Sequence, residues 1–229
     1  MPGGGTDGWK MSMDKTDYLH ATALVDCDHP AVRAFAQRAA ADKHTAKDKA
    51  IALYGAVRDS IQYDPYIDFF DPAMFRASGV LSAGRGFCVG KSALLTAAAR
   101  ATGIPARPGY ADVRNHLTSK RLKETVGDIF LWHSYTEFKV DGRWVKCTPA
   151  FDRMLCERAG IRPLDFDGMN DSLFHPFDRS GRRHMEYLRD RGAFEDVPFE
   201  AIVADFKKLY PRLLAASPAA ANFRDEVTT

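Results

Sequence analysis

The stretch that decides the fold covers residues 84–101 and reads GRGFCVGKSALLTAAARA. Cys88 stands between glycines and opens an Ala/Leu-rich helical run from Lys91 to Ala101, which stops at Gly103-Ile104-Pro105. Unpaired backbone N–H groups and the helix dipole favour negative charge at a helix N-terminus. We therefore expect the pKa of the Cys88 thiol to be lowered, which would make its sulfur more nucleophilic than that of an ordinary buried cysteine.

A β-hairpin is predicted further along the chain. Asp141-Gly142 lies between two β-rich runs, 128–140 and 143–150, and is the strongest short-range signal for a two-residue turn. The turn sets a register in which His133 lies opposite Ala150. The hairpin therefore fixes which residues share a face with His133.

Thr148 and Asp152 are the diagonal neighbours of His133 in this register, provided that the strand continues past Pro149. An acid there could hold the imidazole in the useful tautomer. A cysteine, a histidine and an acid together indicate covalent catalysis, in which the thiolate attacks an acyl carbon and the histidine exchanges the proton. The predicted catalytic residues are Cys88, His133 and Asp152, and the backbone N–H of Cys88 is expected to donate to the developing oxyanion.

Each of these residues has a structural alternative. A cysteine in an apolar helix is often a packed core residue. A histidine beside Trp132 is often structural, and an aspartate can simply cap a turn. Their order and spacing together favour a catalytic site.

Composition indicates one soluble globular domain. The 229 residues are 45% hydrophobic and 27% charged, and the formal net charge of +2 gives no argument for nucleic acid or a membrane as a partner. The expected organisation is a flexible leader over 1–15, a single domain with helical extensions over 16–213, and a disordered tail over 214–229. Helices are expected over 30–41, 45–62, 181–191 and 198–213, a strand over 106–113, and an aromatic-rich loop over 64–85 that could wall a pocket or merely pack.

Cysteine and histidine spacing argues against metal chemistry. The four cysteines form no Cys-x-x-Cys pair, and the remaining histidines form no close ligand pair, so we expect no metal and no cofactor. No secretory signal and no apolar run of roughly 20 residues is visible, which favours reduced thiols in the cytoplasm. The expected partner is a peptide or small amide substrate.

The sequence resembles a known family in two places. Residues 84–95, followed by RATGIPAR at 100–107, closely resemble the nucleophile segment of the transglutaminase-like superfamily, which has a papain-like fold and bacterial members. HSYTEF at 133–138 and DGRWV at 141–145 resemble its histidine strand and hairpin. The resemblance covers about residues 45–152. It implies an α+β fold in which a nucleophile-bearing helix packs on an antiparallel sheet, and acyl chemistry through a thioester.

One position departs from the family pattern. Family members usually place an aspartate four residues after the hairpin tryptophan, where this chain has Thr148 after Trp144. Either Asp152 supplies the carboxylate or Thr148 offers a weaker hydroxyl, and Asp152 is preferred. The sequence therefore predicts a cysteine-dependent hydrolase or acyltransferase that acts on an amide or peptide bond, with hydrolysis favoured. The alternative is a catalytically inactive binding module that uses the cleft for a peptide or protein partner.

Overall fold

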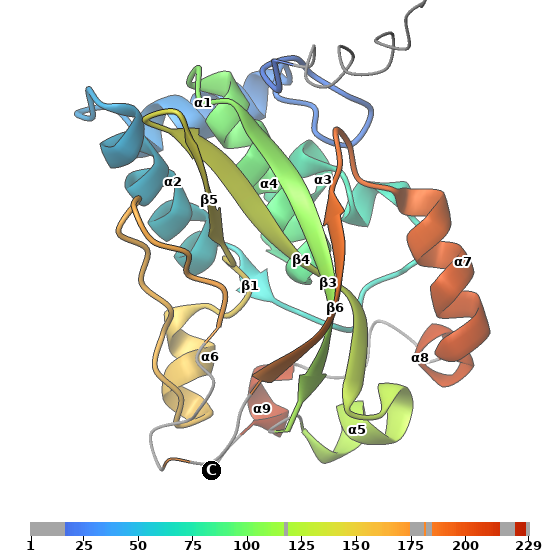
Figure 1. The fold of residues 1–229 in the computed structure, drawn as a ribbon. Coiled ribbons are helices and arrows are strands. Elements are labelled where there is room, and N and C mark those ends of the chain that lie inside the picture. Colours follow the sequence, from blue (N-terminus) through green and yellow to red (C-terminus); the bar gives the residue numbers. More distant parts are fainter. Residues whose placement is uncertain (1–16, 117–118, 175–180, 182–184, 216–222, 228–229) are drawn as a thin grey trace, which may run out of the picture.

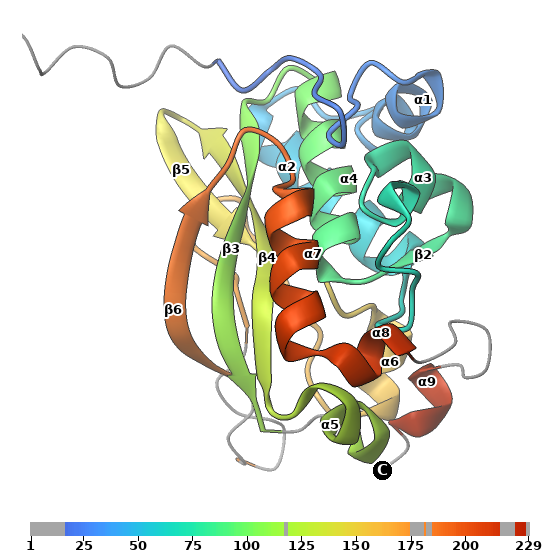
Figure 2. The same cartoon turned by 90° about the vertical axis from the view of Figure 1, so that its right-hand side faces the viewer.

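A four-stranded antiparallel sheet forms the centre of the protein, in a computed structural model that describes residues 17–116, 119–174, 181, 185–215 and 223–227. The strand order is β5-β4-β3-β6, and helices gather on one side of the sheet (Figures 1 and 2). The strands are β3 (Ala106–Asn115), β4 (Ile129–Val140), β5 (Arg143–Cys147) and β6 (Met185–Ala193). The predicted α+β fold class is confirmed.

The central helix is α4 (Cys88–Ala101), which packs on the sheet as the resemblance implied. All its residues through Arg100 are buried, so it has no polar face for solvent. Polar groups attach it to β4, because the hydroxyls of Ser92 and Thr136 lie 2.8 Å apart and the Thr136 hydroxyl donates to the Ser92 carbonyl at 3.1 Å. Around α4 lie α1 (Pro30–Ala39), α2 (Ala46–Ser60) and α3 (Ala77–Ala83).

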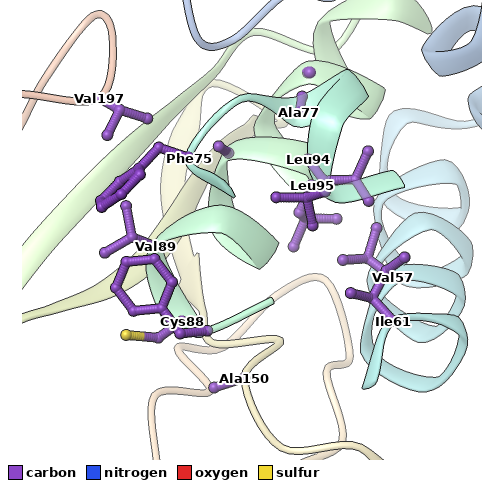
Figure 3. Close-up of a cluster of buried hydrophobic side chains, with 14 of the residues drawn as sticks. Val57, Ile61, Phe75, Ala77, Cys88, Val89, Leu94, Leu95, Ala150 and Val197 are labelled. Atoms are coloured by element: carbon purple, nitrogen blue, oxygen red, sulfur yellow. The ribbon is translucent and has the colours of Figure 1, made fainter. Parts of the chain in front are cut away.

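The middle of α4 and its N-terminal end face different surroundings. Leu94 and Leu95, in the middle of α4, lie near Val57 of α2 in the hydrophobic core, whereas the Cys88 sulfur lies at the N-terminal end of the helix (Figure 3). The core therefore holds α4 along its length and leaves Cys88 at its margin.

The predicted hairpin register is confirmed. Val140 pairs with Arg143, and the ladder continues to Thr136 opposite Cys147. Asp141 and Gly142 both have positive φ, 49° and 78°, as a two-residue hairpin turn with this twist requires. However, β5 ends at Cys147 and not at residue 150, because a proline follows at 149 and cannot donate to the ladder.

The C-terminal region differs most from expectation. The helix predicted over 181–191 is wrong, because Met185–Ala193 form the edge strand β6, paired antiparallel with β3. The helix predicted over 198–213 is divided into α7 (Phe199–Leu209) and α8 (Pro211–Ala215), because proline favours the first turn of a new helix. The leader over 1–15 lies outside the described residues. Within the tail expected to be disordered, over 214–229, Phe223–Glu226 form the short helix α9.

The aromatic-rich segment over 64–85 is more ordered than a loop. It contains the 3₁₀ helix η1 (Pro72–Met74) and α3, and its ends are joined by a parallel pair of short strands, β1 (Gln62–Tyr63) and β2 (Arg85–Gly86). At one end of the sheet α5 (Lys120–Val126), α6 (Arg153–Arg158) and α9 gather below the strands (Figures 1 and 2). In the part of the chain that the structure describes, no helix has the length and apolarity needed to cross a membrane.

Candidate active site

Cys88 is the first residue of α4 and lines a cavity that His133 of β4 also lines. Its side chain is largely enclosed, with 8% of the residue exposed. The backbone N–H groups of Ser134 and Val89 favour the ionised form of the sulfur. The structure therefore brings the predicted pair, Cys88 and His133, into one cavity.

The expected lowering of the Cys88 pKa is wrong. Burial removes the sulfur from water and raises the pKa of the Cys88 thiol to about 11. The N–H groups of Ser134, Val89 and Cys88 lower this pKa, as a helix N-terminus should, but desolvation outweighs them. The thiol is therefore protonated at neutral pH.

His133 follows an irregularity in β4. Ala111 pairs with His133 and Val113 pairs with Phe130, so two residues of β4 oppose one residue of β3. This is a β-bulge, a feature that bends a strand and redirects a side chain next to it. Within the bulge Trp132 has φ of 58°, a left-handed conformation that is costly for a bulky residue.

Three charged side chains hold the bulge around Trp132. Its backbone N–H donates to Asp112 Oδ1 at 3.2 Å, and its indole Nε1 donates to Asp205 Oδ2 at 2.8 Å. The guanidinium of Arg191 lies 4.2 Å from the centre of the Trp132 ring and bonds both carboxylates, at 2.6 and 3.2 Å. This network fixes the residue directly before His133. Only the proximity of Trp132 to His133 was visible in the sequence.

Asp152 is buried and occupies the N-cap of α6. Its carboxylate accepts the N–H groups of Leu155 (3.0 Å) and Tyr63 (3.1 Å), and pairs with Arg224 at 2.9 Å. These contacts give it a structural role. Its predicted role as the group that orients His133 stays a prediction.

Thr148 is the other candidate orienting group, at the position where family members usually carry an aspartate. It is buried and lines a second cavity, of about 360 Å³, together with His133. Among the described residues its hydroxyl has no hydrogen-bond partner. The alternative orienting group thus shares a cavity with His133.

A third cavity, of about 610 Å³, also reaches His133 and is walled by the C-terminal segment. Phe223 of α9 packs edge-on against Tyr63 and Tyr66, at ring distances of 5.6 and 6.1 Å. The Tyr66 hydroxyl donates to Glu226 at 2.7 Å. Sequence reasoning missed this contribution, because the segment lies within the tail that was expected to be disordered.

Lys91 is an unexpected charged group one turn after Cys88. It is fully buried, and its Nζ donates to the carbonyls of Arg58 (2.9 Å) and Ile61 (2.5 Å) at the end of α2. Desolvation lowers its pKa to about 7. Within the described residues, no group of three or more His, Cys, Asp or Glu side chains could hold a metal ion.

A helix-borne cysteine and a strand-borne histidine thus share a cavity on an α+β core with an antiparallel sheet. The chain belongs to the transglutaminase-like superfamily, because the model of that family matches residues 33–149, just over half of the 229 residues. This span contains Cys88 and His133 and ends before Asp152. No curated protein matches the sequence.

Solved structures that are similar to this chain include two candidate proteases. A candidate cysteine protease from Cytophaga hutchinsonii shares 17% identity over 81% of this chain and 48% of that protein, with a TM-score of 0.47. A candidate protease from Parabacteroides distasonis shares 18% identity over 54% of this chain and 25% of that protein, with a TM-score of 0.38. The chain thus spans about half of the first protein and a quarter of the second.

Proposed function

We propose that this protein is a cysteine-dependent hydrolase that cleaves an amide or peptide bond through a thioester on Cys88, with His133 as general base and acid. The observation that supports it best is the cavity shared by Cys88 at the start of α4 and His133 behind the bulge of β4. The substrate is a peptide or a small amide.

The chemistry follows from a thiol that is neutral at rest. Because burial raises the Cys88 pKa to about 11, the proton leaves as the sulfur attacks and not before. His133 accepts this proton while the sulfur bonds to the acyl carbon. The imidazolium then gives the proton to the departing amine as the C–N bond breaks. Water adds to the thioester, His133 takes its proton, and the same proton returns to the sulfur as the C–S bond breaks.

The developing oxyanion needs donors at the start of α4. The backbone N–H of Cys88 is the predicted donor, and a helix N-terminus stabilises negative charge. Of the two candidate orienting groups, the contacts favour Thr148, because the Asp152 carboxylate already binds Tyr63, Leu155 and Arg224.

One observation favours the non-catalytic binding module. A buried cysteine whose pKa is raised by desolvation behaves as an inert core thiol. The two functions differ in whether Cys88 becomes acylated faster than the other buried cysteines, Cys27, Cys147 and Cys156.

Acylation by 4-nitrophenyl acetate tests the proposal, because its acyl group is too small to depend on a specificity pocket. Intact-mass and peptide analysis should locate the acetyl group on Cys88, and Cys88→Ser should remove it. His133→Gln should slow acetylation about 10²- to 10⁴-fold, the usual contribution of a general base. Cys27→Ser, at a buried cysteine that lines none of the three cavities, is the matched control and should leave Cys88 acetylation unchanged. Slow and equal labelling of all four cysteines would favour the binding module.

A further inference from the structure

Besides Cys88 and three residues of β4 (Phe130, Leu131 and His133), three other parts of the chain wall the cavity beside Cys88. Its volume is about 470 Å³, including its opening to solvent. One wall is aromatic and comes from the segments around β1, β2 and η1, with Phe69 and Phe87 in edge-on contact at 5.3 Å. A second wall comes from α5, through Leu122 and Val126.

The third wall comes from the C-terminal helices. Phe206 of α7 contacts both Phe69 and Tyr210 at ring distances of 5.3 Å, and Leu213 of α8 completes the lining. All three C-terminal residues lie outside residues 33–149, which the family model matches. The shape of this cavity is therefore not a property that the family resemblance supplies.

Apart from Cys88, His133 and the hydroxyls of Tyr63 and Tyr210, the lining of this cavity is apolar. Among the described residues that line this cavity there is no Asp, Glu, Lys or Arg. The Tyr210 hydroxyl is already used, since it donates to the carbonyl of Ile129 at 2.8 Å and accepts the N–H of Leu131 at 2.9 Å. A charged group that entered this cavity would lose its hydration without gaining an ionic partner. An aromatic or aliphatic group would exchange water for apolar contact.

We infer that this cavity binds the acyl side of the substrate and selects a large apolar side chain. Among apolar side chains it prefers aromatic ones. The inference rests on the proposed function, because it needs Cys88 as the nucleophile. Selection takes place when the sulfur bonds to the acyl carbon, while the side chain on that carbon occupies the cavity.

Two activated esters test the inference, namely the 4-nitrophenyl esters of N-acetylphenylalanine and N-acetylglutamate. In each reaction the Cys88 sulfur bonds to the acyl carbon, His133 takes the thiol proton, and 4-nitrophenolate leaves. Nitrophenolate release and intact mass give the rate of Cys88 acylation. We expect the phenylalanine ester to react about ten- to a hundredfold faster, the scale at which an apolar pocket discriminates.

The substitution Leu213→Arg introduces a positive charge into the lining of the cavity beside Cys88. It should lower the ratio of the phenylalanine rate to the glutamate rate at least about tenfold, because the guanidinium can pair with the substrate carboxylate. The matched control is Leu209→Arg, which adds the same charge on the exposed side of α7 and should leave the ratio unchanged. If Leu213→Arg does not fold, the ratio of the phenylalanine rate to the glutamate rate in the unmodified protein is sufficient to test the selectivity.

The outcomes separate the two proposals. Equal rates with both esters, in a protein that 4-nitrophenyl acetate acetylates at Cys88, would overturn the selectivity and leave the proposed function standing. No preferential acylation of Cys88 by any of the three esters would overturn the proposed function and the selectivity together.

Discussion

Trp132 and Asp112 face each other across the β-bulge of β4, with the Trp132 backbone N–H donating to Asp112 Oδ1 at 3.2 Å. Trp132 has the left-handed φ of 58° and directly precedes His133. Left-handed non-glycine residues persist only where their surroundings hold them, and they cluster at functional sites. The contact therefore connects a buried carboxylate of β3 to the direction in which His133 points.

Arg191→Gln should test whether this bulge positions His133. The change removes the cation over the Trp132 ring and its ion pairs with Asp112 and Asp205. We expect Cys88 acylation to slow about ten- to a hundredfold, because misplacement by roughly 1 Å has effects of this size. Arg189→Gln, at an exposed position of the same strand, is the control. Equal slowing in both variants would contradict the positioning role.

The rate of Cys88 alkylation by iodoacetamide should rise with pH through the alkaline range. Only the thiolate reacts, and burial raises the Cys88 pKa to about 11. The rate should therefore increase about tenfold per pH unit from pH 7 and level off near pH 11. Peptide mapping distinguishes Cys88 from the other three cysteines. A plateau already reached at pH 7 would mean that His133 holds the sulfur as an ion pair.

Gly90→Ala should destabilise the protein through the N-terminal turn of α4. A Cβ at Gly90 would lie 2.6 Å from the Met74 carbonyl oxygen and 2.7 Å from Val80 Cγ2. Overpacking of this kind costs about 1–3 kcal/mol. Gly55→Ala is the matched control, because its Cβ would meet nothing within 4 Å inside α2, and it should stabilise the protein by about 0.5–1 kcal/mol. Urea denaturation measures both, and equal effects would refute the close approach.

Lys91 should make stability depend on pH. Its folded pKa is about 7 and its ordinary value is 10.5, so between these values the unfolded chain binds more protons than the folded protein. The contribution of Lys91 to the free energy of unfolding should therefore rise from pH 7 to pH 10, by on the order of 3 kcal/mol.

The test compares the unmodified protein with Lys91→Met in urea at both pH values. The difference in unfolding free energy between the two proteins should shift in favour of the unmodified protein at pH 10. Lys43→Met, at an exposed position, should show no such shift. A difference that is the same at pH 7 and pH 10 would show that Lys91 is charged in the folded protein throughout.

Asp152→Ala and Thr148→Ala should have different effects. Removal of the Asp152 carboxylate leaves Arg224 and the N–H groups of Tyr63 and Leu155 without their acceptor, which should cost on the order of 3 kcal/mol of stability. Thr148→Ala should change stability little and slow Cys88 acylation about tenfold. The reverse pattern, a larger loss of acylation in a stable Asp152→Ala protein, would restore Asp152 as the orienting group.

Local signals explain what the sequence predicted well. Asp141-Gly142 determines a turn by its own φ angles, and the register of β4 and β5 follows from the turn. The Ala/Leu-rich run that follows Cys88 specifies a buried helix in the same local way.

The missed features depend on residues far apart in the sequence. The region of β6 was expected to be helical, whereas it forms a strand because it pairs with β3, which lies some distance earlier in the chain. The Cys88 pKa depends on enclosure by segments from three regions, which no local pattern reveals. Asp152 departs from the predicted strand because the ladder ends before Pro149 and a helix begins instead.

The cavity beside Cys88 has one further consequence, for how proteins of this kind can diversify. The reactive sulfur and imidazole lie within residues 33–149, whereas Phe206, Tyr210 and Leu213 lie beyond them. Exchange of the C-terminal helices between homologues could therefore alter this cavity, and it would leave His133 in place only if a carboxylate at the position of Asp205 still bound Trp132 and Arg191. A fragment trimmed to the family-matched span would lose this wall of the cavity together with Arg191 and Asp205, which hold the residue before His133.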